Sequence, residues 1–301
     1  MSRPAVLGVG RIGASIVGLA PWIPDPTSGE AGELTDVAVA PGPGVAVAVQ
    51  TAARLGCAGR LAGWVGADGL GALVRATLTQ AGLDVELVRA AGGSPAELVT
   101  VDLHGQRLLQ RTAAAPLDLD GVAIDVDTAL GGIAAVLLDD TAPAAQLAVA
   151  QRARARGVPI VLDLTSPQED VGELVAFADV VITSERMLAE LAPRRDLFEA
   201  LGELLRLGPR ASVVTLGAAG AIGRHGGELV EVPGFPVDVV DVTGAGSVFH
   251  GAFVAGLLGE LPFARCIELA SAAAGLSCQT LGAWRGIPDH SAAVTLATSR
   301  R

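Results

Sequence analysis

The chain has 301 residues, half of them hydrophobic, so it can bury one large core, and we expect a single domain over residues 1–301. Its formal net charge of −11 argues against nucleic acid and against anionic membranes as partners, because both carry the same sign of charge. The sequence has neither a long uncharged apolar run nor a basic leader segment, and it therefore predicts a cytoplasmic protein without a membrane span.

Short apolar, β-branched segments alternate along the chain with longer amphipathic ones. This order is typical of an α/β fold, in which helices cover a mostly parallel sheet. The predicted core strands are Ala5–Val9, Leu61–Val65, Ala135–Asp139, Pro159–Leu164, Val180–Thr183 and Ser212–Leu216. The predicted helices are Gly69–Ala81, Ala144–Arg156, Arg186–Leu191 and Leu197–Leu207.

Two segments interrupt this alternation. Ser15–Ala40 and Val85–Arg111 have strand periodicity and turn residues, with no long helix between the strands. We predict that they combine into one small β-sheet that projects from the core and covers a cleft as a lid. The exposed apolar face of such a sheet would need a partner, and a second copy of the chain would supply one.

The three cysteines, Cys57, Cys266 and Cys278, are odd in number and far apart in the sequence. None belongs to a Cys-x-x-Cys pair. This pattern favours buried free thiols over a disulfide or a zinc site.

A glycine-rich segment, Asp241–Ser247, reads Asp-Val-Thr-Gly-Ala-Gly-Ser and precedes the apolar run Val248–Leu258. It follows two short alternating strands, Ala221–His225 and Leu229–Pro233. A Gly-Ala-Gly turn that opens a helix leaves backbone N–H groups without an intrahelical partner, at the positive end of the helix dipole. The segment can therefore bind a phosphate. The alternative is an ordinary turn into a core helix.

This segment resembles the second signature of the ribokinase-like (PfkB) carbohydrate kinases, Asp-Thr-x-Gly-Ala-Gly-Asp. Further resemblances occur in the family's order over nearly the whole chain, at Arg54-Leu55-Gly56, Val65–Gly71, Leu78 with Gly82-Leu83-Asp84, His104–Arg107, Thr215–Ala221 and Leu281–Pro288. The last is similar to the branch that contains ketohexokinase and sulfofructose kinase. The resemblance implies a ribokinase-like three-layer α/β/α sandwich with a mostly parallel central sheet, a small β-sheet lid, and a homodimer joined through the lid.

The resemblance also implies ATP-dependent phosphoryl transfer to a sugar or sugar-like alcohol, with Mg²⁺. It assigns the anion hole to Gly244, Ala245 and Gly246, and nucleotide binding to Thr215, Gly217, Gly220 and Ser184. Asp241 and Thr243 match positions associated with a metal or a monovalent cation. The alternative for Asp241 is an Asx-type cap on the turn.

The chain departs from the family pattern where the chemistry would occur. Ser247 stands at the position of the catalytic base, an Asp in the family. At the two sugar-binding positions, Ser15 replaces an Asp and Val47 replaces an Asn, and Gly42-Pro43 replaces the double glycine before Val47. Ser184 and Met187 stand where the family has Asn and Glu for magnesium and phosphate, although the ketohexokinase branch also carries Ser there. Because a general base contributes about 10²–10⁴-fold in rate, we expect impaired catalysis.

Three functions remain open at this point. The chain is a PfkB kinase with impaired catalysis, a non-catalytic pseudokinase that binds a nucleotide or small ligand as a sensor or partner protein, or a kinase for a different alcohol that uses another base. His250, one helical turn after Ser247, is interpreted as a packing residue. The remaining polar candidates are interpreted as solvated strand ends (Asp139, Asp140, Asp163) and as surface arginines (Arg11, Arg107, Arg285).

Overall fold

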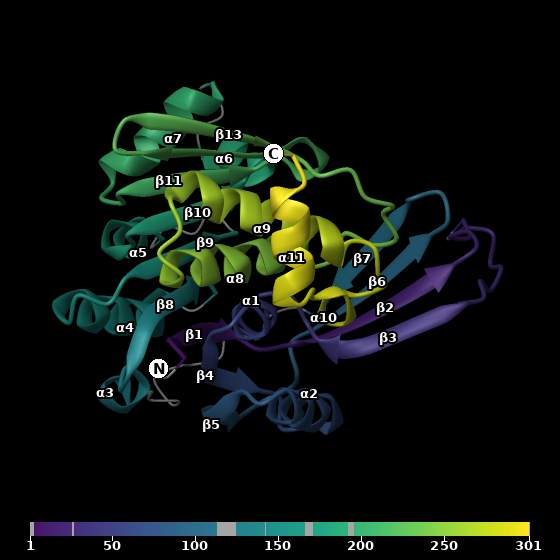
Figure 1. Ribbon diagram of the computed structural model, residues 1–301. Coiled ribbons are helices and arrows are strands. Elements are labelled where there is room, and N and C mark those ends of the chain that lie inside the picture. Colours follow the sequence, from purple (N-terminus) through teal and green to yellow (C-terminus); the bar gives the residue numbers. More distant parts are fainter. Residues whose placement is uncertain are drawn as a thin grey trace.

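The computed structural model describes residues 3–25, 27–112, 125–141, 143–165, 171–191 and 196–300. Its central layer is a nine-stranded sheet with the order β13-β12-β11-β10-β9-β8-β1-β4-β5 (Figure 1). The strands from β5 to β11 in this order are parallel, and β12 and β13 are antiparallel. Their bounds are β1 (Ala5–Arg11), β4 (Ala58–Val65), β5 (Asp84–Ala90), β8 (Ile133–Asp139), β9 (Ile160–Leu164), β10 (Val180–Ser184), β11 (Ala211–Thr215), β12 (Gly220–His225) and β13 (Glu228–Pro233).

Helices cover both faces of this sheet and complete the predicted three-layer sandwich. One buried cluster joins the sheet to α1, α2, α8 and α9, and a second joins its other face to α4, α5, α6 and α7. Neighbouring residues of one strand divide between the two clusters, as Leu137 and Leu138 do, because successive side chains point to opposite faces. The helices are α1 (Val45–Arg54), α2 (Gly69–Gln80), α3 (Val126–Ala129), α4 (Pro143–Ala155), α5 (Val171–Phe177), α6 (Glu185–Leu191), α7 (Leu197–Arg206), α8 (Ala245–Leu258), α9 (Phe263–Ser277), α10 (Ala283–Gly286) and α11 (His290–Thr298).

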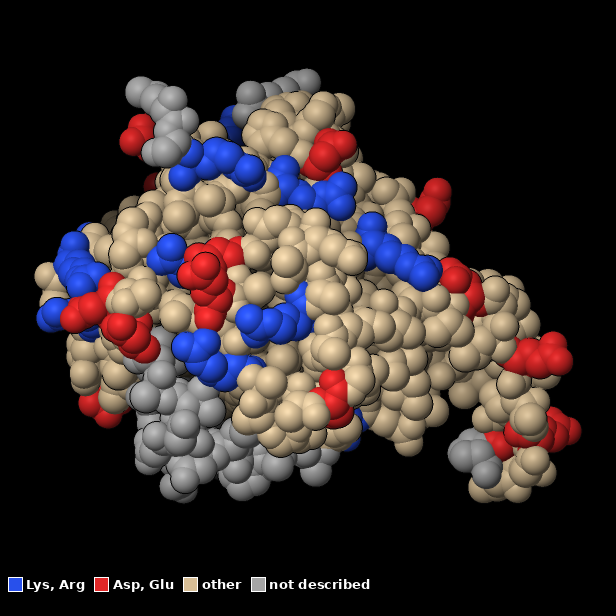
Figure 2. Space-filling view, turned by 90° about the horizontal axis from the view of Figure 1, so that it is seen from below, with Lys and Arg blue, Asp and Glu red and all other residues tan. Residues whose placement is uncertain are grey.

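A second sheet of four strands projects from the core, at the right of Figures 1 and 2. Its order is β3-β2-β6-β7, and only β2 and β6 are parallel. The strands are β2 (Ala14–Ala20), β3 (Asp36–Pro41), β6 (Ala96–Asp102) and β7 (Arg107–Arg111). The inner face packs through Val17, Ala38, Val99 and Val101 against Leu281. The small separate sheet is therefore confirmed.

One part of the predicted lid lies elsewhere. Residues 85–90 belong to β5, which pairs with β4 at the edge of the main sheet, so their assignment to the lid is wrong. An edge strand is partly exposed, as a strand of the small sheet is, and β5 mixes buried with exposed residues. Periodicity identifies a half-exposed strand, but it does not say which sheet the strand joins.

The helices α1 and α8 approach each other very closely at Gly251. A Cβ at this position would stand 2.0 Å from the Ala48 carbonyl oxygen and 2.7 Å from Cβ of Thr51. Only a glycine fits such a contact, and it brings the first turns of the two helices together. This contact positions the site described below.

All three cysteines are free and buried, as predicted. Burial raises the pKa of each thiol, that of Cys266 to about 11. In the part of the chain that the structure describes, no helix combines the length and the apolar character that crossing a membrane requires.

Candidate active site

The predicted anion-binding segment opens α8. Gly244 is the N-cap with φ 74°, and a Cβ there would stand 2.4 Å from Cβ of Ala283. Among the described residues, no side chain caps this helix start. The N–H of Ala245 donates to the Val242 carbonyl at 3.3 Å, so this donor is already engaged. The N–H groups of Gly246 and Ser247 belong to the first turn, where helix geometry provides no intrahelical acceptor.

A cavity of about 470 Å³ leads from the end of β11 to this helix start. Thr215, Gly217 and Gly220 line one end, and Ala245 and Gly246 line the other. Most of the remaining wall is apolar, and its members include Phe235, Val237, Val239, Val242, Phe249, Ala274 and Cys278. The structure thus brings together three predicted nucleotide-binding residues and part of the predicted anion hole.

Two serines near this cavity differ in their environment. The hydroxyl of Ser271 is buried in the cavity wall and has no hydrogen-bond partner among the described residues. Ser184 is not part of the cavity wall, and its Oγ accepts the N–H of Met187 at 3.2 Å at the start of α6. The predicted nucleotide role of Ser184 therefore has no support from the cavity, whereas Ser271 was not predicted.

Ser247 lies where the first turns of α1 and α8 meet. Its side chain is buried, and its Oγ accepts the N–H of Gly44 at 2.8 Å. Gly44 is the N-cap of α1 and has φ 113°. This hydrogen bond joins the turn that contains Gly42 and Pro43 to Ser247, the residue at the position of the family's catalytic base.

Asp139, Asp140 and Asp163 are buried at the carboxyl ends of β8 and β9, so the interpretation as solvated strand ends is wrong. Asp139 Oδ1 accepts hydrogen bonds from the Thr141 backbone, the Thr141 hydroxyl and Gln146. Both carboxylate oxygens of Asp140 accept from Thr165. Buried carboxylates need such partners because an unpaired buried charge is costly.

His250 connects α8 to β9 through Asp163. Its Nε2 lies 3.2 Å from Asp163 Oδ1, and its Nδ1 lies 2.6 Å from the Gly246 carbonyl oxygen. The packing interpretation of His250 agrees with its burial, but the carboxylate partner was not predicted. Burial raises the pKa of Asp163 to about 6, against the opposing effect of His250, and the nearby Asp140 and Asp139 raise it further.

We expect the stability of Asp163→Asn relative to the wild type to depend on pH. The folded pKa of Asp163 is about 6, above the ordinary value of 3.8. Between these values the folded chain retains a proton that the unfolded chain has lost. Wild-type stability therefore falls as pH rises through this window, by about 1.4 kcal/mol per unit. Asn does not titrate, so this loss is absent in the variant.

Urea unfolding of both proteins at pH 4.5 and 7 measures the effect. We expect the wild type to lose roughly 1–2 kcal/mol relative to Asp163→Asn between these two values. The exposed carboxylate variant Glu190→Gln is the control and should follow the wild type. A constant difference between wild type and Asp163→Asn would contradict the prediction.

Ser15 faces a carboxylate that was not predicted. Its Oγ donates to Glu97 Oε1 at 2.9 Å, and Glu97 Oε2 lies 3.6 Å from Nε of Arg111. Glu97 is buried on β6, on the same face as Val99 and Val101. That period of two is the sequence signal that could have found it, since a carboxylate in phase with two buried valines points inward.

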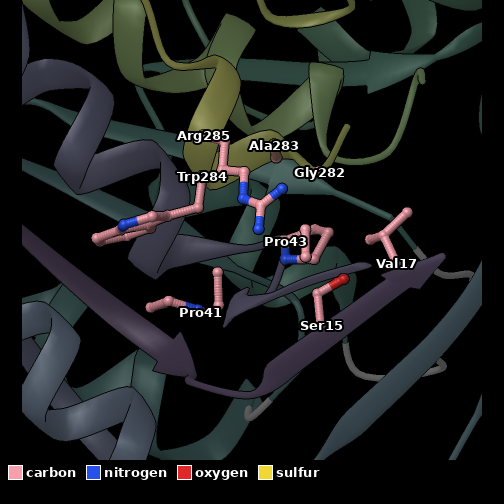
Figure 3. Close-up of a pocket in the computed structure, with 10 residues that line it drawn as sticks. Ser15, Val17, Pro41, Pro43, Gly282, Ala283, Trp284 and Arg285 are labelled. Atoms are coloured by element: carbon pink, nitrogen blue, oxygen red, sulfur yellow. The ribbon is translucent and has the colours of Figure 1, made fainter. Parts of the chain in front are cut away.

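The other predicted acceptor-side residues are tightly enclosed. Val47 is fully buried in the core cluster around α1. Gly42 and Pro43 line a cavity of about 20 Å³ with Glu97, and Ser15 lines another of about 10 Å³ beneath α10 (Figure 3). A cavity of this size holds about one water molecule. Neither of these two cavities has room for a sugar in this conformation.

Two arginines interpreted as surface residues connect the small sheet to the core. Arg107 of β7 donates to Thr243 Oγ1 at 3.0 Å, directly before α8. Arg285 of α10 lies 3.2 Å from Asp36 Oδ2 and donates to the Val37 carbonyl of β3 at 2.9 Å. Their contacts join the small sheet to both sides of the predicted site.

Asp241 caps the turn before α8. Its Oδ1 accepts from the N–H and the hydroxyl of Thr243, and its Oδ2 accepts the Gly282 N–H at 2.9 Å. This geometry is that of the Asx-type cap considered above. The described residues contain no group of three or more His, Cys, Asp or Glu that could hold a metal ion.

Comparison with known proteins agrees with the fold. The model of the pfkB family carbohydrate kinases matches residues 18–290. A ribokinase of Haemophilus influenzae is 27% identical over an alignment of 310 positions that covers 96% of this chain and 96% of that protein. An ATP-dependent ribose-1-phosphate kinase of Halopiger xanaduensis is 32% identical over 251 residues, 80% of each chain. Arabidopsis thaliana ribokinase, solved with ribose and ATP, aligns over 99% of both chains with a TM-score of 0.80 and 25% identity.

The family match extends from the small sheet through the start of α8 to α11. It includes the strand end, the cavity and the glycine-rich turn described above. The chain therefore belongs to the pfkB family of carbohydrate kinases.

Proposed function

We propose that the protein transfers the γ-phosphoryl group of ATP to a hydroxyl of a sugar or sugar-like alcohol. The observation that carries this proposal is the cavity that begins at Thr215–Gly220 and ends against the start of α8. The base and ribose would lie near Thr215–Gly220, and the phosphates over Gly244–Ser247. Because ATP is the donor, we assign the reaction to the cytoplasm.

The cavity suits a nucleotide in its chemistry as well as its position. Its apolar wall favours a flat base, and the unpartnered hydroxyl of Ser271 offers a hydrogen bond to a polar edge of that base. The uncapped first turn of α8 supplies backbone donors for phosphate oxygens.

Magnesium would arrive with the nucleotide. In phosphoryl-transfer sites Mg²⁺ keeps several waters and binds substrate phosphates together with one or two carboxylates, so it does not need an all-protein cage. Such a site is compatible with the lack of a metal-binding cluster in the described part of the chain. For a monovalent cation we propose the turn of Asp241 and Thr243.

The acceptor would lie between the small sheet and the core, near Ser15, Gly42 and Glu97. Because the cavities there hold about one water each, the sheet has to move for a sugar to enter. The contacts of Arg107 and Arg285 with the opposite side resist this movement. Such partly exposed pairs contribute roughly 0–1 kcal/mol each, so a bound acceptor can offset their loss. We propose that the small sheet acts as a lid.

The second candidate is a non-catalytic pseudokinase that binds nucleotide or a small ligand, and Ser247 is the observation in its favour. A Ser hydroxyl does not accept a proton at neutral pH as a carboxylate does. Val47, buried in the core, also leaves one expected sugar ligand without a replacement.

Calorimetric titration with ATP-Mg, followed by a coupled assay of ADP release against pentoses, hexoses, sugar phosphates and nucleosides, separates the two functions. The proposed kinase gives saturable turnover with at least one acceptor, within the ordinary range of about 1–100 per second. Binding of ATP without turnover on any acceptor supports the pseudokinase. Neither binding nor turnover would overturn both.

We also propose a homodimer through the outer face of the small sheet. Val37, Val39, Leu98 and Leu108 are 42–49% exposed, and the strand register puts them on one face. A contiguous apolar face is typical of an interaction site, and a second copy offers an equivalent face.

We expect Leu98→Glu to convert the dimer into a monomer, because two buried carboxylates would face an apolar surface across the interface. Light scattering coupled to size-exclusion chromatography at micromolar concentration measures the mass. Leu207→Glu, an exposed leucine on the core beyond α7, is the matched control and should leave the mass unchanged. A monomeric wild type would refute the interface.

A further inference from the structure

We propose that Asp139 is the general base of this enzyme, at the end of β8 instead of at the start of α8. This inference rests on the proposed kinase function. It concerns the group that takes the proton from the acceptor hydroxyl, a role that Ser247 cannot fill.

The buried Asp139 carboxylate lies against two glycines, Gly10 and Gly44. A Cβ on Gly10, at the end of β1, would stand 2.3 Å from Asp139 Oδ2, so only glycine leaves room for the carboxylate. A Cβ on Gly44 would stand 3.8 Å from the same oxygen. Gly44 also donates its N–H to Ser247 Oγ at 2.8 Å. Asp139 Oδ2 and Ser247 Oγ therefore both lie beside residue 44.

The two oxygens of Asp139 have different environments. Oδ1 accepts from Thr141 and Gln146, which orient the carboxylate. Oδ2 accepts no hydrogen bond from the described residues. One oxygen is therefore held in place while the other keeps its lone pairs available for a proton.

The neighbouring carboxylates and the histidine are engaged elsewhere. Both oxygens of Asp140 accept from Thr165. Asp163 and His250 pair with each other, and the second ring nitrogen of His250 lies against the Gly246 carbonyl. Glu97 is held by Ser15 and Arg111 on the small sheet. What distinguishes Asp139 from these groups is its position, because its Oδ2 lies beside Gly44, the residue that donates to Ser247.

Burial raises the pKa of Asp139, the bonds from Thr141 and Gln146 oppose this effect, and the charge of Asp140 adds to it. The titratable groups around it are Asp140 on its own strand end, Asp163 on β9 with His250 of α8, and Arg11 at the end of β1. A carboxylate with a raised pKa accepts a proton more readily near neutral pH.

In the proposed step, the acceptor hydroxyl gives its proton to Asp139 Oδ2 while its oxygen attacks the γ-phosphorus of ATP. The bond between the γ-phosphorus and the bridging oxygen breaks, and ADP leaves with that electron pair. The products are the phosphorylated acceptor, ADP and protonated Asp139, which releases its proton to water after the products depart. The Ser247 hydroxyl positions the turn at Gly44.

The test uses Asp139→Asn, which keeps the Oδ1 acceptor for Thr141 and Gln146 and replaces only Oδ2. We expect kcat to fall by about 10²–10⁴-fold and the acidic limb of the pH–rate profile to disappear, while the dissociation constant for ATP changes less than about threefold. Ser247→Ala is the comparison variant, and it should keep the acidic limb. A second variant, Asp139→Ala, should regain activity when formate is added, because formate can occupy the vacated space and accept the proton.

Wild-type kcat and an intact acidic limb in Asp139→Asn would overturn the proposal, as would a failure of formate to rescue Asp139→Ala. If Asp139→Asn does not fold, the formate experiment decides. If the wild type transfers no phosphate to any acceptor, the proposed function itself fails. A normal rate in Asp139→Asn would instead leave the kinase function intact and refute only the role of Asp139.

Discussion

Replacing Gly251 with valine is expected to destabilise the protein by about 3 kcal/mol, at the upper end of the usual cost of overpacking. The first added carbon would stand 2.0 Å from the Ala48 carbonyl oxygen, which is backbone and cannot rotate away. The helices α1 and α8 would have to separate at their closest contact. Because this contact brings Gly44 and Ser247 together, we also expect any kinase activity to fall.

Urea unfolding followed by circular dichroism measures the loss of stability. Gly246→Ala in the same helix is the matched control, since no atom lies within 4 Å of its Cβ position. Helix propensity alone should make that variant more stable, by up to about 1 kcal/mol. If Gly251→Val unfolds at the same urea concentration as the wild type, α1 and α8 do not pack as described.

Replacing Gly275 with leucine is expected to weaken nucleotide binding strongly, with little change in fold stability. Gly275 lies in the wall of the 470 Å³ cavity, and its Cβ position has only ordinary contacts, 3.7–4.0 Å from Val237 and Phe235. The leucine side chain would occupy space that we assign to the base. We expect the dissociation constant for ATP to rise at least roughly 100-fold, equal to about 2.7 kcal/mol.

Calorimetric titration with ATP-Mg measures this change, and thermal unfolding without ligand monitors the fold. Gly275→Ala is the control, because a methyl group fills little of the cavity and should cost less than about tenfold in affinity. Unchanged ATP binding in Gly275→Leu would show that the nucleotide does not use this cavity.

Most of the core could be predicted from the sequence because buried parallel strands are continuous apolar runs. The helix α1 shows the limit of this approach. Its residues Val45–Val49 are all buried, so the segment alternates Val and Ala without a polar face and has no helical period. No element is predicted there from periodicity. Only the resemblance indicated that Val47 stands at an expected ligand position.

Those parts of the candidate site that lie within one short stretch of sequence could be predicted. The turn before α8 carries its own signature, and Thr215 lies at the end of a predicted strand. The pairs Ser15–Glu97 and Asp163–His250 join residues that are 82 and 87 positions apart, and no local pattern states which strand ends meet. The order of the strands puts Asp139, Asp140 and Asp163 at one edge of the sheet. Whether their side chains are buried depends on the helix that covers this edge, and the strands alone do not show it.

Of the departures from the family pattern at positions 15, 47 and 247, two have local compensation. Ser15 is hydrogen-bonded to Glu97, and an Asp at position 15 would set two carboxylates against each other. The hydroxyl of Ser247 satisfies the N–H of Gly44. An Asn at position 47 would instead bury an amide in the core, at a cost of roughly 1–3 kcal/mol without a partner. Each single substitution back to the family residue would therefore disturb contacts that the present residue makes.

The hydrogen bond from Arg107 to Thr243 has a consequence for the order of events in a reaction cycle. Thr243 donates in turn to Asp241, and Asp241 holds Gly282, so the small sheet, the turn before α8 and the C-terminal segment form one connected unit. Any ligand that favours one position of the sheet also favours one arrangement of that turn. By thermodynamic reciprocity, the donor that we propose at the turn and the acceptor that we propose under the sheet would change each other's affinity by the same factor. Such coupling would favour closure when both substrates are present, and so protect the donor from reaction with water.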